Sequence, residues 1–145
     1  MAYLIFNKTD SSLYKIAANE TDKDNLNIID DQWTIKDISD SDFTLVKNGE
    51  KLVELSGDTV TYTDVNMTYE SADLLQEWIN NIISLINDFK ANGNNQSNPN
   101  YDSVVAYGQY LNDFDTSTIT YPLDKSWEQY CADTGVTYFN SLQLP

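Results

Sequence analysis

A chain of 145 residues is long enough for one compact domain, and a hydrophobic content of 41% with 12% aromatic residues is enough to build a core. Eight lysines stand against 23 acidic residues, which gives a net charge of −15, and the chain has no arginine and no histidine. It therefore lacks the cations that neutralise nucleic-acid phosphates, and it lacks the imidazole of common nucleophilic and metal sites. We expect neither direct nucleic-acid binding nor enzymatic activity.

Residues 1–69 have the pattern of short strands and turns. Residues 3–6 form a β-prone run, 7–12 a polar turn and 13–18 a second strand, which together predict a hairpin. A charged loop is expected over 19–25. The weak alternation over 27–31 and 33–38 predicts one strand or two, in which Trp33, Ile35 and Ile38 could face a common core.

The next segment leaves two alternatives open. Residues 43–47 lie between Ser39-Asp40-Ser41-Asp42 and Asn48-Gly49, and they fit either a capped short helix or a strand. Residues 51–55 and 59–63 flank Ser56-Gly57-Asp58, a sequence typical of a tight turn. This pattern predicts a second hairpin.

Residues 71–92 carry the clearest pattern of the chain, that of an amphipathic helix. Ser71 is a suitable N-cap, and Gly93 follows the expected end. So wide an apolar arc must be covered by more than one neighbour, so we expect the N-terminal sheet on one flank and a second helix on the other. The arc, about half of the helical wheel, consists of Leu74, Leu75, Trp78, Ile79, Ile82, Ile83, Leu85, Ile86 and Phe89.

The remaining residues predict two further helices. After the polar loop 92–100, residues 101–114 resume helical spacing, which Gly108 weakens, and residues 127–135 form a short helix capped by Asp124 or Ser126. Residues 115–122 and 136–145 are expected to be extended. We therefore predict a single α+β domain of residues 1–145, in which N-terminal antiparallel hairpins (1–69) pack on a helical half (70–145) with an extended C-terminal tail.

Few residues could carry chemistry. Cys131 has no cation nearer in sequence than Lys125, so it is interpreted as a buried hydrophobic residue. No carboxyl lies in a strongly apolar stretch, so none is expected to have a raised pKa. Glu20, Asp22, Asp24 and Asp31 mimic the spacing of a calcium loop over 20–31, but Asn25 replaces the required glycine, which favours a solvated acidic turn. We predict no catalytic residue, no metal site and no cofactor.

Aromatic and terminal apolar residues suggest a different kind of site, a surface for another macromolecule. Trp33, Trp78 and Trp127 fall in patterned segments and are expected in the core, whereas the tyrosines of the second half could form a partly exposed strip. The tail carries leucines, so we expect it to dock on its own domain or on a neighbouring subunit. The predicted interface draws on Tyr101, Tyr107, Tyr110, Tyr138, Phe139, Leu142 and Leu144.

Several short stretches resemble small proteins of T4-like tailed phages that infect marine bacteria. Besides the long Leu/Ile/Asn-rich helix, they are Ala2-Tyr-Leu-Ile-Phe-Asn, Ile38-Ser-Asp-Ser-Asp-Phe43, Thr118-Ile-Thr-Tyr-Pro-Leu123 and Leu142-Gln-Leu-Pro145. The resemblance implies a phage gene product, and together with the composition it suggests a non-enzymatic structural or accessory protein of the virion, made in the host cytoplasm. Its expected partners are other virion proteins or itself.

Two further expectations follow. The chain has neither the basic leader of a signal peptide nor the roughly 20 apolar residues of a membrane span, so we expect no secretion and no membrane. No small-molecule substrate is expected. The alternative function is that of a small acidic effector, similar to a DNA mimic, which binds a basic protein through its negative charge.

Overall fold

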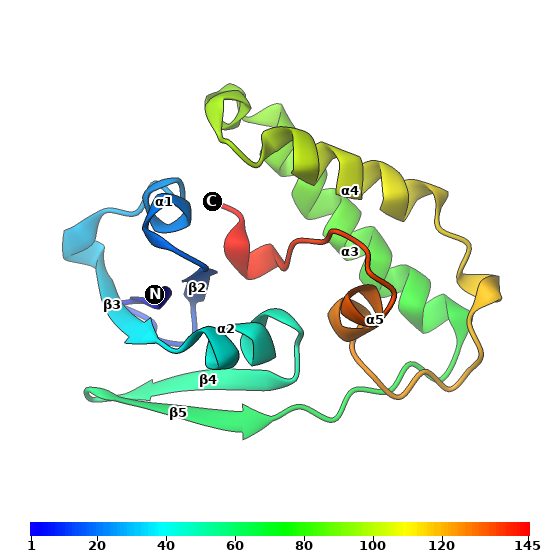
Figure 1. Ribbon diagram of the computed structural model, residues 1–145, viewed down its shortest axis with the longest axis horizontal. Helices are drawn as coiled ribbons and strands as arrows, with labels where there is room; N and C mark the ends of the chain where they lie inside the picture. The colour runs from blue at the N-terminus through cyan, green and yellow to red at the C-terminus, as the bar shows by residue number, and fades with distance from the viewer. The chain divides into compact units, whose positions relative to one another are not determined.

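The computed structural model describes residues 1–145, with the exception of the side chain of Asp30 (Figure 1). The fold is α+β, with antiparallel strands in the N-terminal part and helices in the C-terminal part, as predicted. The chain forms two compact units. Unit 1 comprises Met1–Val65 and Leu142–Pro145, and unit 2 comprises Asn66–Ser141. The chain thus leaves unit 1 at Val65 and returns to it at Leu142. That both halves share one core remains a prediction.

A three-stranded antiparallel sheet in the order β2-β1-β3 forms the centre of unit 1. The middle strand, β1 (Ala2–Asn7), pairs with β2 (Tyr14–Ala17) on one side and with β3 (Trp33–Ile38) on the other. Leu4, for example, lies opposite Ile16 and opposite Lys36. The predicted N-terminal hairpin is confirmed, and the stretch 27–38 supplies one strand rather than two.

Both faces of β1 are buried because its side chains alternate between two hydrophobic clusters. Leu4 and Phe6 belong to the first cluster, whereas Ile5 belongs to the second. Trp33 and Ile35 pack against the second cluster, but Ile38 lies in the first. The prediction that these three residues could face a common core is therefore wrong for Ile38, because an odd separation along a strand changes the face.

Two short helices complete this part of the chain. α1 (Glu20–Asp24) lies where a charged loop was expected. The Asn19 side chain caps this helix and accepts a hydrogen bond from the Asp22 N–H at 2.9 Å. α2 (Asp40–Lys47) resolves the open alternative in favour of a helix. Its N-cap is Ser39, whose hydroxyl accepts from the Asp42 N–H at 3.1 Å. A 3-10 turn, η1 (Asp30–Gln32), precedes β3.

The second predicted hairpin is confirmed as β4 (Lys51–Ser56) and β5 (Thr59–Asp64), which form a two-stranded sheet. Gly57 opens the two-residue turn with φ of 61°, a conformation that L side chains rarely adopt. Val53, Leu55 and Val60 pack on the first cluster. The hairpin therefore presents one face to the core of unit 1 and the other face to solvent.

The C-terminal tail docks on its own chain, as one of the two expectations had it. Leu142 packs against the first cluster, and Leu144 is buried, while its carbonyl accepts a hydrogen bond from Lys15 Nζ at 2.5 Å. The tail is not wholly extended, because a 3-10 turn, η4 (Ser141–Gln143), lies within it. These contacts explain why the tail belongs to unit 1.

The predicted long helix is α3 (Ala72–Ala91) of unit 2, and the Ser71 hydroxyl caps it. Its buried side chains are Leu75, Ile79, Ile82, Ile86 and Phe89. Leu74 and Leu85, at the edges of the apolar arc, are 47% and 46% exposed. The expectation that the whole arc is covered is therefore wrong, since the buried residues, three or four apart, follow a narrower stripe.

The second predicted helix, α4 (Tyr101–Asp113), packs against α3. The two helices approach closely at Gly108, where a Cβ atom would lie 3.0 Å from Cγ2 of Ile86. Gly108, which weakens the helical pattern in the sequence, is thus needed for packing. The third helix is α5 (Trp127–Asp133), and its N-cap is Ser126. Two 3-10 turns, η2 (Gly93–Ser97) and η3 (Thr116–Thr118), lie in the connections.

An aromatic core holds the helices of unit 2 together. Trp127 is fully buried, its ring centroid lies 4.9 Å from that of Phe114 and 5.3 Å from that of Tyr130, and its indole N–H donates to the Tyr107 hydroxyl at 2.9 Å. Such ring pairs and satisfied polar tips are typical of buried aromatic residues. Within the part of the chain that the structure describes, no helix is both long enough and apolar enough to cross a membrane.

Candidate functional site

Of the seven residues predicted for an interface, three are buried and four are half-buried. Tyr107, Tyr138 and Leu144 are buried, and the other four, Tyr101, Tyr110, Phe139 and Leu142, are half-buried. Leu142 and Leu144 belong to unit 1, whereas the five aromatic residues belong to unit 2. Tyr107 and Tyr138 are therefore corrected from surface to interior positions, because unit 2 uses its tyrosines to fill its own core.

The acidic stretch 20–31 does not have the shape of a calcium loop. Glu20, Asp22 and Asp24 lie within α1, and residues two apart on a helix do not point to a common centre. The Glu20 carboxylate is bound by Lys23 Nζ and by the Tyr3 hydroxyl, each at 2.6 Å. Among the described side chains, no group of three His, Cys, Asp or Glu residues is gathered as a metal site.

Unit 2 contains a buried carboxyl group that the sequence did not predict. Glu128, in the first turn of α5, is only 5% exposed, and this burial raises its pKa above the ordinary value for glutamate. The Glu128 N–H and the Trp78 indole act in the opposite direction. The prediction that no carboxyl has a raised pKa is therefore wrong for Glu128.

Two polar atoms near Glu128 are also buried, the Tyr69 hydroxyl and the Trp78 Nε1. The Trp78 indole faces Glu128, and the Tyr69 hydroxyl faces the backbone of Trp127. Burial, and secondarily the charge of Glu128, raises the pKa of the Cys131 thiol to about 12. The thiol is thus protonated at neutral pH, and the interpretation of Cys131 as a buried hydrophobic residue is confirmed. Glu128 and Cys131 are both buried, whereas Tyr69 and Trp78 also line a depression of about 330 Å³ on unit 2.

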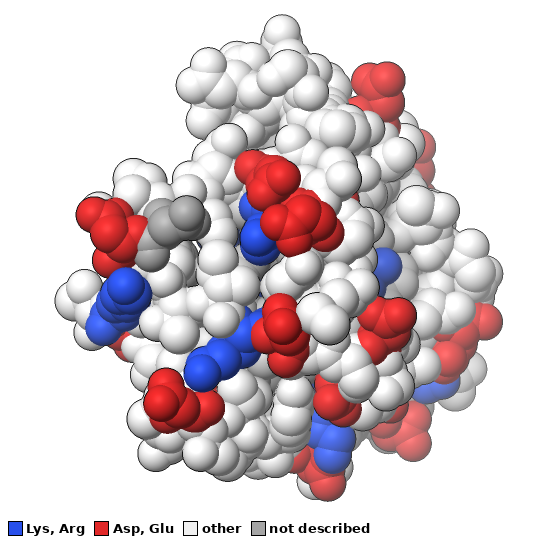
Figure 2. All heavy atoms as spheres, turned by 60° about the vertical axis from the view of Figure 1, so that its left-hand side comes forward, with Lys and Arg blue, Asp and Glu red and all other residues white. Residues whose placement is uncertain are grey.

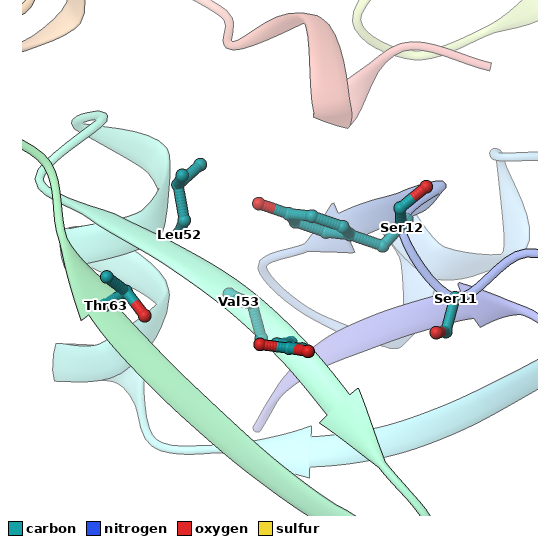
Figure 3. A pocket seen from close by; sticks show the side chains of 7 residues that line it. Ser11, Ser12, Leu52, Val53 and Thr63 are labelled. Atoms are coloured by element: carbon teal, nitrogen blue, oxygen red, sulfur yellow. The ribbon is translucent and has the colours of Figure 1, made fainter.

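An accessible depression lies in unit 1, between the β4–β5 hairpin and the turn that joins β1 to β2. Its volume is about 400 Å³. In Figure 3, Leu52 and Val53 on β4 stand across the depression from Ser11 and Ser12 on the turn. We call it the hairpin groove, and its lining residues are Ser11, Ser12, Tyr14, Leu52, Val53, Glu54 and Thr63.

Large apolar side chains are exposed at this groove. Leu52 lines it and is 58% exposed, and Leu13, between the lining residues Ser12 and Tyr14, is exposed to the same extent. Leu52 and Glu54 are two residues apart and therefore share the solvent face of β4, whereas Val53 points to the core. Leu52 therefore places an exposed aliphatic side chain on an otherwise polar strand face, at the mouth of the groove.

Tyr14 forms the floor of the groove and is held in place from two sides. Its ring centroid lies 5.7 Å from that of Phe6 in the first cluster. Burial raises the pKa of its hydroxyl, and a hydrogen bond from the Val53 N–H opposes this effect. The hydroxyl therefore stays protonated at neutral pH, and it links β2 to the edge of β4.

The groove carries negative but no positive charge. Glu54 forms no ion pair with any side chain that the structure describes. Asp10, beside the lining residues, accepts hydrogen bonds from the Ser12 hydroxyl at 2.6 Å and from the Ser12 N–H at 3.0 Å, and these bonds lower the pKa of its carboxyl. Of the two lysines that adjoin lining residues in sequence, Lys51 is paired across the hairpin with Asp64, and Lys15 donates to the Leu144 carbonyl.

The sequence held one signal for this groove. In the stretch 51–56, strict alternation would place a polar residue at position 52, between Lys51 and Val53, but Leu52 stands there. The other wall could not be foreseen, because Ser11 and Ser12 are about 40 positions away along the chain and reach the groove only through the fold.

Comparisons of this chain with protein-family models, curated proteins and solved structures give no match. The groove and the surface charge are therefore the observations that bear on function. On the face drawn in Figure 2, acidic side chains are scattered among uncharged ones, and most of the visible lysines lie next to an acidic side chain. Unit 1 has six lysines and thirteen acids, a net charge of −7, and unit 2 has two lysines and ten acids, a net charge of −8.

Proposed function

We propose that this chain is a non-enzymatic structural or accessory protein of a phage virion, and that it acts by binding other proteins of the particle through the hairpin groove. The observation that carries the proposal is the exposed, mainly apolar groove with Leu52 and Leu13 beside it. Apolar surface at such a site supplies attraction when a partner covers it, on the order of 25 cal/mol per Å².

Two further observations support a binding role. Glu128 and Cys131, whose pKa values burial raises, are buried in unit 2. The groove, in contrast, is lined by hydroxyls, aliphatic groups and one carboxylate without an imidazole or an unpaired cation to assist catalysis. These features favour recognition over turnover.

The first experiment tests the assignment to a virion. Mass spectrometry of purified particles of the phage that encodes the chain is expected to find the protein at a fixed copy number. Its detection only in infected-cell lysate, and not in washed particles, would contradict the proposal.

The second experiment tests the groove. Leu52→Lys is expected to reduce incorporation into particles at least about tenfold, because it places a charge on the apolar contact. Leu85→Lys is the matched control, since Leu85 is also an exposed leucine but lies on α3 in unit 2. Both variants should keep the parent's stability to within about 0.5 kcal/mol. Equal incorporation of the two variants would refute a role of the groove.

The charge distribution favours a second candidate, a small acidic effector that binds a basic protein. Four lysines are paired with acids, namely Lys23, Lys36, Lys51 and Lys125, so the remaining acids are not balanced within the chain. Long-range attraction by such a surface weakens steeply with salt. Association that falls more than about tenfold between 50 and 300 mM salt, with no protein in the particle, would select this candidate.

A further inference from the structure

We propose that the hairpin groove receives a cationic side chain, lysine or arginine, from the partner protein. This inference rests on the proposed function of the groove and names the class of partner that it recognises. The apolar walls of the groove support it, as does the Glu54 carboxylate, which forms no ion pair with any described side chain.

The walls fit the stem of a long basic side chain. Leu52 and Tyr14 provide an aliphatic and an aromatic surface that are both open to the groove. Lysine and arginine lay their methylene groups on such surfaces while the charged head stays in contact with water or a carboxylate. A guanidinium group also stacks on an aromatic ring, which suits Tyr14.

The charges fit the head of the same side chain. Glu54 lines the groove, and Asp10 lies beside it with its carboxyl held by Ser12. Lys51, which could neutralise these acids, is held by Asp64 on the neighbouring strand. The Glu54 carboxylate therefore lines the site without an ion-pair partner among the described side chains.

The backbone of β4 limits how a partner can enter the groove. The Val65 N–H donates to the Glu50 carbonyl at 3.0 Å, which fixes the alternation of the ladder. The even-numbered residues of β4 therefore bond to β5, and the N–H of Val53 points away from it. Because this N–H meets the Tyr14 hydroxyl at the centre of the strand edge, a partner enters the groove with a side chain and not as an added β strand.

A second copy of this chain is a poor occupant. Each copy carries a charge of −15, so two copies repel each other. A basic segment of another protein complements the groove both in charge and in shape.

The test uses the full chain and a defined probe, the peptide acetyl-Thr-Val-Arg-Val-Thr-amide. Its control has citrulline in place of arginine, which keeps the shape and removes the charge. Two-dimensional amide NMR should show saturable shifts at Ser11, Ser12, Leu52, Val53, Glu54 and Thr63 with the arginine peptide, and binding at least about threefold weaker with the citrulline peptide.

Two matched variants separate the groove from general attraction to an acidic protein. Glu54→Gln and Glu50→Gln change the net charge equally, but Glu50 is an exposed residue that does not line the groove. We expect Glu54→Gln to weaken binding of the arginine peptide about three- to fivefold and Glu50→Gln to weaken it less than 1.5-fold. Equal effects of the two variants, or equal binding of the two peptides, would overturn the inference.

Its failure can be told apart from that of the proposed function. If Leu52→Lys abolishes incorporation while Glu54→Gln has no effect on the arginine peptide, the groove binds proteins but not through a cationic side chain. If shifts at the groove residues grow with protein concentration in the absence of peptide, the occupant is a second copy, and the inference is likewise wrong.

Discussion

The hairpin groove of unit 1 and the Glu128 cluster of unit 2 use similar residues in opposite ways. At the groove, Leu52 is exposed and the Glu54 carboxylate lies at the surface, whereas in unit 2 Glu128 is buried among aromatic rings with the thiol of Cys131 nearby. The carboxyl group whose pKa is raised is therefore buried in unit 2, and the carboxyl group that is accessible lies at the groove of unit 1. The residues with the most perturbed chemistry are enclosed, and the accessible residues have the chemistry of a binding surface.

The largest effect is expected from the aromatic core. Trp127→Ala should lower the free energy of unfolding by about 3–5 kcal/mol, because it leaves a cavity among Phe114 and Tyr130 and removes the hydrogen bond to Tyr107. Leu52→Ala at the groove should change it by less than about 0.5 kcal/mol. Urea unfolding of both variants measures the contrast, and a large loss for Leu52→Ala would show that the groove is part of a core.

Removing the ionisable group of the buried Glu128 should raise the free energy of unfolding, and by less than Trp127→Ala lowers it. Burial raises the pKa of Glu128 in the folded chain, so its contribution to stability is present below the unfolded pKa and is lost as pH rises through the folded pKa. Glu128→Gln cannot ionise, so at neutral pH it should be more stable than the parent, by on the order of 1 kcal/mol. The difference should shrink toward pH 4.

Glu54→Gln serves as the control for this measurement, because Glu54 is exposed at the groove. Its stability should follow that of the parent to within about 0.5 kcal/mol at neutral pH. If Glu128→Gln is instead less stable than the parent at every pH, the Glu128 carboxyl makes a favourable contact in the folded chain, and the contrast between the two sites disappears.

Replacing either of two glycines by alanine should lower the free energy of unfolding by about 1 kcal/mol. Gly108→Ala introduces a Cβ 3.0 Å from the buried side chain of Ile86, whereas Gly57→Ala has free space but a φ of 61°. Asparagine tolerates positive φ, so Gly57→Asn should recover part of the loss and Gly108→Asn should not. Thermal unfolding of the four variants distinguishes crowding from backbone strain, and equal recovery at both positions would contradict this division.

The sequence predicted the helices and strands better than it predicted which side chains are buried. The periodicity of residues 71–92 and the turn at Gly57 identified α3 and the second hairpin, because both signals are local. The burial of Glu128 was missed, since the groups that enclose it include Tyr69 and Trp78, about 50 residues earlier in the chain. Tyr107 and Tyr138 were misplaced for a related reason, because composition does not distinguish a partly exposed tyrosine from a buried one.

The return of the chain to unit 1 has a consequence for synthesis on the ribosome. Unit 1 begins with Met1–Val65 but includes Leu142–Pro145, whose Leu142 side chain packs against its first cluster and whose Leu144 carbonyl binds Lys15. Every residue of unit 2 is therefore translated before the closing piece of unit 1 is made. The unit that starts first is the one that finishes last, so a nascent chain passes through a stage in which unit 2 is complete and the sheet of unit 1 still lacks its final cover.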